Sequence, residues 1–401
     1  MKILTLMPYT PVPPNFGGAL RIYNLLQQMC ARHEVDILMF GSESSRKPVC
    51  DAFNLPSDRV HILAGSRWLS TQNWKRLGQA YSLLTGNSLT ELAARNAPLQ
   101  RMLDSLLSRN KYDLLQLEFP VMGYYRFESD AIKIMDAHNV EYEIHQRIAA
   151  SADTRIRRFW ADYECRKFQP EEIQICRDQD AILTTSQRDK DALDKDAPGV
   201  PKFVIPNGVD TTFFQTESDA TEPESVVFTG AMDYFPNTDG IQYFLDRILP
   251  LVRKQMPNIK VYIVGNRPTP QLVRQASDNV VVTGFVDDIR PFVERSSAYI
   301  VPLRQGGGTR LKVLEAMSMR RPMVTTTVGC EGIDVTHNES VLMADEPESF
   351  AQAVVSLLGD EALQKKLVKN AFEIVRSHYD WDVIGVKLED TYGKICEEAR
   401  S

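Results

Sequence analysis

The sequence lacks any apolar run long enough to cross a bilayer, which as a helix takes roughly 20 consecutive apolar residues. Between Lys2 and Pro8 there is only a short apolar-biased run, typical of a buried strand and not of a signal peptide. The six cysteines show no CxxC or Cys/His ligand spacing. These absences argue against a membrane-spanning protein, a disulfide framework and a zinc site, and they favour a reducing cytoplasm.

An excess of positive charge is also lacking, because the formal net charge is -7 at pH 7. A nucleic-acid-binding protein that relies on an overall positive field is therefore not expected. Two segments, 67–81 and 147–168, nevertheless mix basic with aromatic side chains. We interpret them either as solvated helix faces or as a surface for an anionic membrane or a lipid-linked acceptor.

Short runs rich in Val, Ile and Leu recur between longer helical patterns, as in parallel sheets that are covered on both faces. Strands are expected at 3–7, 35–40, 60–63, 114–117, 132–135, 181–184 and 203–205, and then at 226–229, 261–264, 280–283, 299–301, 323–325 and 341–343. This order predicts an α/β protein with two Rossmann-like, doubly wound parallel-sheet domains. We expect their carboxyl edges to face each other across a deep cleft.

Domain boundaries are suggested by composition. Residues 216–225 are rich in Glu, Ser and Thr and contain Pro223, which suits an exposed connection. We therefore divide the chain into an N-terminal domain, 1–215, and a C-terminal domain, 216–380. The last segment, 381–401, is expected to form a helix that crosses back to the N-terminal domain.

Gly17 and Gly18 follow the first strand and open a helix. Backbone N–H groups and the positive end of the helix dipole make such a turn a candidate anion site, and a tight structural turn is the alternative. The turn does not match GxGxxG, nor does the first turn of the second half. A dinucleotide-dependent oxidoreductase is therefore disfavoured.

The most specific motif runs from Val301 to Met317, where three glycines follow a buried strand and precede a helix. Glycines allow the main chain to approach a ligand closely, and the helix N-terminus supplies free N–H groups. On that helix Glu315 can accept both hydroxyls of a ribose, while Arg310 or Lys312 neutralises phosphates. The alternative is a helix-surface ion pair between Glu315 and Lys312, worth about 0.2–0.5 kcal/mol, which would not need the glycines.

Together these motifs resemble glycosyltransferase family 4, whose members are retaining, metal-independent enzymes of GT-B fold. The GGGTRLKVLEAM sequence at 306–317 indicates a glycine-rich subgroup. The resemblance covers nearly the whole chain and rests in addition on the Gly17–Gly18 turn and on 205–210, 228–230, 283–288 and Trp381.

The resemblance implies a cytoplasmic, hexosyltransferase-like enzyme without a metal or other cofactor. It would move a sugar, with retention, from a UDP- or GDP-linked donor held by the C-terminal domain to an acceptor on the N-terminal domain. The acceptor would be a glycan or a lipid-linked molecule in cell-surface or exopolysaccharide biosynthesis. A peripheral position at the inner face of the cytoplasmic membrane, through the N-terminal domain, is a further expectation, and nucleic acid is not an expected partner.

Site residues follow from the same resemblance. Glu315 would hold the donor ribose, and His138 would contact the transferred sugar unless it is a locally bonded strand-end histidine. The implied catalytic residues are His138, Arg310 and Lys312. The implied donor-binding residues are Gly17, Gly18, Gly230, Phe285, Val286, Gly307, Gly308, Thr309, Leu311 and Glu315.

The chain also departs from the family pattern. Gly307 stands where family members commonly carry a glutamate that binds the transferred sugar, so sugar recognition is expected to differ. Basic residues often found after the first strand of the second domain are replaced around Met232 and Asn237, which leaves phosphate neutralisation to Arg310 and Lys312. Two alternatives stay open: a non-catalytic nucleotide-sugar-binding partner protein, and a nucleotide-sugar epimerase of the same fold.

Overall fold

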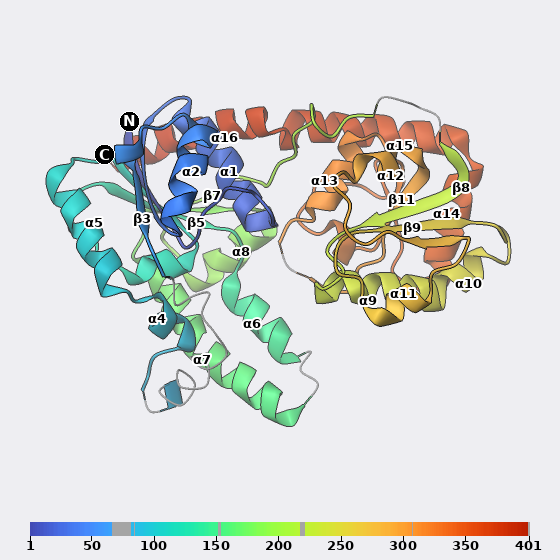
Figure 1. Ribbon diagram of the computed structural model, residues 1–401, viewed down its shortest axis with the longest axis horizontal. Coiled ribbons are helices and arrows are strands. Elements are labelled where there is room, and N and C mark those ends of the chain that lie inside the picture. The colour runs from blue at the N-terminus through green and yellow to red at the C-terminus, as the bar shows by residue number, and fades with distance from the viewer. Residues whose placement is uncertain (66–81, 84, 151–153, 217–220, 307, 400–401) are drawn as a thin grey trace. The chain divides into compact units, whose positions relative to one another are not determined.

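A computed structural model describes the protein at residues 1–65, 82–83, 85–150, 154–216, 221–306 and 308–399. The chain divides into two compact units: unit 1 consists of Met1–Pro206 and Gly385–Ser401, and unit 2 of Asn207–Ile384. The divisions suggested by the sequence, after residues 215 and 380, both lie within unit 2. Figure 1 shows a parallel sheet with covering helices in each unit.

The sheet of unit 1 has the strand order β3-β2-β1-β4-β5-β6-β7, and all neighbouring strands are parallel. Residues 3–7 of the first strand are all buried, because helices cover both faces of the sheet. The strands are β1 Lys2–Met7, β2 Glu34–Phe40, β3 Val60–Leu63, β4 Leu114–Glu118, β5 Ile132–Ala137, β6 Ala181–Thr184 and β7 Lys202–Val204.

The larger helices of unit 1 are α1 Gly17–Cys30, α2 Arg46–Phe53, α4 Leu89–Ala94, α5 Ala97–Arg109, α6 Glu141–Ala150, α7 Arg155–Arg177 and α8 Gln187–Asp196. Helix α1 buries Ile22, Leu25 and Met29, whose spacing of three and four residues forms one apolar face. The last helix, α16, spans Trp381–Glu398, and its residues from Gly385 onward belong to unit 1. Its buried Tyr392 donates a hydrogen bond to the side chain of Gln116 in β4.

The sheet of unit 2 has the strand order β10-β9-β8-β11-β12-β13, again with parallel neighbours. Its strands are β8 Glu222–Thr229, β9 Lys260–Val264, β10 Val280–Val282, β11 Ser296–Val301, β12 Met323–Thr325 and β13 Leu342–Met343. Its helices include α9 Phe235–Tyr243, α10 Leu249–Val252, α11 Pro270–Arg274, α12 Arg290–Arg295, α13 Leu311–Ser318, α14 Pro347–Gly359 and α15 Glu361–Ile374.

Two parallel-sheet α/β units, as the sequence predicts, are confirmed, and every predicted strand overlaps an observed one. The strand order changes direction between β1 and β4 in unit 1 and between β8 and β11 in unit 2. Ligands of open α/β sheets bind outside the carboxyl ends of the strands at such switch points. The loops that follow these four strands are therefore the places to look for a site. Among the described residues, no helix combines the length and the apolar character needed to span a membrane.

Candidate functional site

The glycine-rich turn of unit 2 connects β11 with α13. Gly306 has φ +146° and Gly308 has φ +69°, backbone conformations that residues with a Cβ rarely adopt. A Cβ at position 306 would also lie 3.0 Å from Nη2 of Arg310. The turn thus needs glycine at both positions, while Gly307 lies outside the described residues.

Arg310 folds back onto this turn. Its Nη1 donates a hydrogen bond to the carbonyl of Gly308, its Nη2 lies 3.7 Å from Glu331, and the residue is only 7% exposed. In this position the guanidinium stabilises the turn. The phosphate contact predicted for Arg310 stays a prediction.

Lys312 extends from the first turn of α13 to the carboxyl end of β8. Its Nζ donates to the carbonyl of Thr229 at 2.6 Å and to Oδ1 of Asn237 at 2.7 Å, and it lies 4.1 Å from the ring centroid of Phe228. A Cβ at Gly230, which has φ +151°, would lie 2.8 Å from this Nζ. The structure therefore brings Gly230 and Lys312 together at the switch point. Asn237, which stands where the family often has a basic residue, is one of the two acceptors that hold the ammonium.

Glu315 lies one turn further along α13 and is half-buried. Among the described residues its carboxylate has no hydrogen bond and no ion pair, and Lys312 bonds to β8 and α9 instead. The surface ion pair considered above is therefore not formed. Burial raises the pKa of Glu315 to about 7 and lowers the pKa of Lys312 to about 7. The negative charge of Glu315 partly offsets the shift of Lys312, and the positive charge of Lys312 partly offsets the shift of Glu315. The carboxylate of Glu315, which has no partner among the described residues, is therefore available to a ligand beside the ammonium of Lys312.

The perturbed lysine makes the stability of the protein depend on pH. A lysine in an unfolded chain titrates near 10.4, so between pH 7 and 10 the unfolded state holds a proton that folded Lys312 has released. The free energy of unfolding should rise with pH across this window, by up to about 1.4 kcal/mol per pH unit from this one group. Chemical denaturation at pH 7, 8 and 9 should show that the free energy of unfolding rises less with pH in Lys312→Met than in the wild type. The exposed Lys365→Met serves as control, and equal slopes in all three proteins would contradict the assignment.

The remaining predicted donor-site residues lie around α13 or on the loop after β10. The hydroxyl of Thr309 is buried and has no hydrogen-bond partner among the described residues, so it can bond to a ligand. Leu311 is the first residue of α13 and is half-buried. Phe285 is 73% exposed, an unusual position for a large apolar ring, while Val286 packs partly against the core. An exposed ring of this kind can border a nucleotide base.

In unit 1 the predicted turn at Gly17 and Gly18 opens α1 as expected. A Cβ at Gly18 would lie 2.5 Å from the hydroxyl of Tyr9 and 3.0 Å from the ring of Phe119. The glycine therefore admits two aromatic rings from the loops after β1 and β4. This close packing supports the structural interpretation of Gly18 and leaves its phosphate contact as a prediction.

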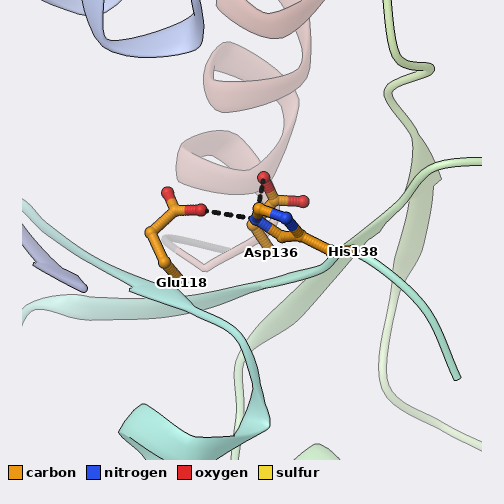
Figure 2. A group of neighbouring side chains, drawn as sticks. All are labelled: Glu118, Asp136 and His138. Atoms are coloured by element: carbon orange, nitrogen blue, oxygen red, sulfur yellow. Dashed lines mark hydrogen bonds and ion pairs between the residues drawn. The ribbon is translucent and has the colours of Figure 1, made fainter. Parts of the chain in front are cut away.

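His138 follows β5 and takes part in a buried polar cluster (Figure 2). Its Nε2 lies 2.8 Å from Oε2 of Glu118 and 3.7 Å from Oδ2 of Asp136, and its ring stacks on Phe119 at 3.8 Å between centroids. Glu118 and Asp136 are direct neighbours in the register of β4 and β5. Burial of the Glu118 carboxyl, together with the nearby negative charge of Asp136, raises the pKa of Glu118.

The partners of this cluster decide what it can hold. Nε and Nη2 of Arg21 each donate to Asp136 at 2.8 Å, and Gln116 donates to Oε1 of Glu118 at 2.8 Å. Ligand atoms of Glu118, Asp136 and His138 lie within 4.8 Å of one another, a spacing that a metal ion could use. A cation there would have to displace the guanidinium of Arg21, so the residues fit a hydrogen-bonded network better than a metal site.

No role was predicted from the sequence for three members of this cluster, Arg21, Glu118 and Asp136. Arg21 stands three residues after Gly18, and Glu118 directly follows the strand predicted at 114–117, so both positions could have been noted. The pairing of Arg21 with Asp136 could not be predicted, because these residues are 115 positions apart in the chain.

Comparison with known proteins connects these sites to a family. Residues 223–360 match the family model described as "Glycosyl transferases group 1". The matched region lies within unit 2 and contains the glycine-rich turn, Lys312 and Glu315.

Relatives extend the likeness beyond the group 1 domain. An uncharacterized 44.6 kDa protein in the cps region of Klebsiella pneumoniae is 23% identical over 393 residues, covering 94% of this chain and 96% of that protein. The lipopolysaccharide core biosynthesis mannosyltransferase LpcC of Rhizobium leguminosarum bv. viciae is 25% identical over 247 residues, covering 57% of this chain and 68% of LpcC.

Solved structures show the fold of the whole chain. Anabaena Alr3699/HepE in complex with UDP-glucose superimposes with a TM-score of 0.67 at 15% identity, covering 98% of this chain and all of that one. Sucrose-phosphate synthase from Thermosynechococcus elongatus gives a TM-score of 0.68 at 17% identity, covering 98% and 99%. The predicted GT-B fold is thus confirmed. Membership of family 4 and of its glycine-rich subgroup stays a prediction.

Proposed function

We propose that this glycosyltransferase belongs to family 4 and transfers a sugar, with retention, from a UDP- or GDP-linked donor to a glycan or lipid-linked acceptor. One observation carries the donor half of the proposal. Among the described residues the carboxylate of Glu315 has no hydrogen-bond or ion-pair partner, and it lies beside the ammonium of Lys312 at the switch point of unit 2. A ribose followed by a diphosphate presents the hydroxyls and the negative charge that this pair complements.

The proposed chemistry needs stabilisation of the negative charge that develops on the departing diphosphate. Lys312 and the hydroxyl of Thr309 are suited to supply it. A bound diphosphate would also raise the pKa of Lys312 and hold it as an ammonium. In a retaining transfer a phosphate oxygen of the donor helps to take the acceptor's proton, so neither an enzymic nucleophile nor a metal ion is required.

The biological setting is proposed from the relatives. The Klebsiella protein is described by its place in the cps region, and the Rhizobium relative acts in lipopolysaccharide core biosynthesis. Anabaena HepE has been solved with UDP-glucose bound. These descriptions support a nucleotide-sugar donor and a role in cell-surface polysaccharide biosynthesis for this chain.

A lipid-linked acceptor is supported by the surface of α7. Ile156 and Phe159 are 73% and 62% exposed and lie three residues apart, on one face of the helix. Exposed Arg155 and Arg158 flank them. Apolar side chains beside basic ones suit the interface of an anionic bilayer, which favours peripheral attachment at the inner face of the cytoplasmic membrane. The other aromatic and basic segment, 67–81, lies outside the described residues.

A panel of nucleotide sugars tests this function. We expect at least one UDP- or GDP-sugar to raise the melting temperature, since a ligand at 100 times its Kd stabilises by about 2.7 kcal/mol. The same donor should release nucleotide diphosphate when glycan or lipid-linked acceptors are added. Interconversion of the free nucleotide sugars would identify an epimerase instead. Binding without hydrolysis or transfer would identify a non-catalytic partner protein.

A further inference from the structure

A small cavity in unit 1 lies beside the histidine cluster and has no role so far. It has a volume of about 90 Å³ and is formed by the loops after β1 and β4 together with α4, α6 and α7. The residues that line it are Pro8, Tyr9, Thr90, Phe119, Pro120, Val121, Glu141, His145 and Phe168. All of them belong to unit 1, so the cavity is complete within that unit.

The walls of the cavity are aromatic. The ring of Tyr9 packs edge-on against Phe119 with centroids 5.8 Å apart, and His145 stacks on Phe168 at 4.8 Å. Burial lowers the pKa of His145, so this imidazole is neutral near pH 7. Flat, uncharged rings of this kind pack well against the C–H faces of a carbohydrate.

Two residues of the lining carry polar groups whose bonding capacity is not used up. The hydroxyl of Tyr9 is buried beside Gly18 and has no hydrogen-bond partner among the described residues. A buried polar group without a partner is destabilising, and a ligand that supplies the partner removes this cost. The carboxylate of Glu141 accepts a bond from Asn139 at 3.3 Å, which leaves acceptor positions unused.

The composition of the lining selects the class of ligand. The described residues of the lining include no lysine or arginine, and the carboxylate of Glu141 would repel a phosphate or another anion. A neutral group with several hydroxyls can donate to Glu141 and bond to Tyr9 while its C–H face packs on the rings. The volume is smaller than the roughly 150 Å³ cavity that holds a benzene ring. One edge of a sugar ring, such as a hydroxymethyl group with a neighbouring hydroxyl, is therefore the part that can enter.

Phe119 connects this cavity to His138. Its ring forms part of the lining and also stacks on the imidazole at 3.8 Å. Phe119 has φ +68°, a left-handed conformation that is costly for a bulky residue. This backbone position places one ring between the cavity and the histidine that is predicted to contact the transferred sugar.

We propose that the cavity is an acceptor subsite, which binds one edge of an uncharged terminal sugar through Glu141 and Tyr9. The identification of the bound sugar as the acceptor rests on the proposed function. The binding of a neutral sugar in the cavity does not depend on that function. In the complex one sugar hydroxyl donates a hydrogen bond to the carboxylate of Glu141, and a second forms a hydrogen bond with the phenol hydroxyl of Tyr9.

Saturation-transfer NMR with four methyl glycosides tests the subsite without any transfer reaction. The probes are methyl α-glucoside, methyl α-galactoside, methyl α-mannoside and methyl α-glucosaminide, of which only the last carries a positive charge. We expect at least one neutral glycoside to bind the wild-type protein. Tyr9→Phe and Glu141→Gln should each weaken that binding about fivefold to tenfold, since each removes one or two hydrogen bonds. Tyr234→Phe and Glu397→Gln, both at exposed positions, should leave it unchanged.

The outcomes separate this inference from the donor proposal. Thermal melting should show that Tyr9→Phe is as stable as the wild type or more so, because the lost hydroxyl has no hydrogen-bond partner among the described residues. Binding of the neutral glycosides with normal affinity in both cavity variants, or no binding to the wild type, would overturn the subsite. Binding of methyl glucosaminide alone would show an ammonium site and would also overturn it. Donor binding in the same samples reports on Glu315 and Lys312, so either proposal can fail while the other stands.

Discussion

Replacement of Glu315 by glutamine is expected to weaken nucleotide-sugar binding by about 10- to 100-fold. The carboxylate is proposed to accept two ribose hydroxyls, and hydrogen bonds to a charged group are worth about 1.5–3 kcal/mol each. Glutamine has the same shape but only one acceptor oxygen and no charge, so part of this energy is lost. Calorimetric titration with the donor identified in the panel measures the change directly.

The stability of the Glu315→Gln variant separates a binding role from a structural one. The carboxylate is half-buried and has no partner among the described residues, and burial disfavours its charge. The melting temperature should therefore be unchanged or higher at pH 8, where the wild-type residue is mainly ionised. Glu373→Gln, at an exposed position of α15, is the matched control. An unchanged donor affinity, or a large loss of stability, would refute the donor role of this residue.

Replacement of His138 by glutamine should lower kcat by about 10- to 100-fold and leave the affinity for the nucleotide diphosphate within twofold. His138 is predicted to contact the transferred sugar and not the nucleotide. Its hydrogen bond, worth about 1.5–3 kcal/mol, therefore forms only when the sugar is present. Rates measured with saturating donor, beside calorimetry with the diphosphate alone, separate the two effects.

Glu118 should act through His138 as a positioning residue. Its Oε2 holds Nε2 of His138 at 2.8 Å, while Gln116 and, beyond it, Tyr392 hold Glu118. Glu118→Gln should reduce kcat less than the histidine variant does, and it should shift the dependence of kcat on pH, because the carboxyl that titrates beside the imidazole is gone. An unaltered pH profile, or nucleotide affinity that falls together with kcat in either variant, would show that the cluster serves folding instead.

The architecture could be read from the sequence because it depends on local patterns. Buried parallel strands such as β1 and β11 are short apolar runs, and glycines mark the turns that follow them. The same local spacing placed Glu315 and Lys312 on the first turns of one helix. The strand order at the switch point between β8 and β11 then brought these residues to the position where ligands of α/β sheets bind.

The side-chain contacts could not be predicted in the same way. The guanidinium of Arg310 bonds to the carbonyl of Gly308, and the direction of a long flexible side chain is not encoded in spacing. The bond between Tyr392 and Gln116 joins residues 276 positions apart, so it depends on the return of the C-terminal helix to unit 1. The predicted phosphate contacts of Arg310 and Lys312 both stay predictions.

The most direct measurement is a structure of the protein with the diphosphate of its preferred nucleotide. The account predicts the diphosphate at the start of α13, near Nζ of Lys312, with the carboxylate of Glu315 about 2.6–3.2 Å from the ribose hydroxyls. A nucleotide bound elsewhere, or a Glu315 carboxylate that makes no contact with the ribose, would contradict it.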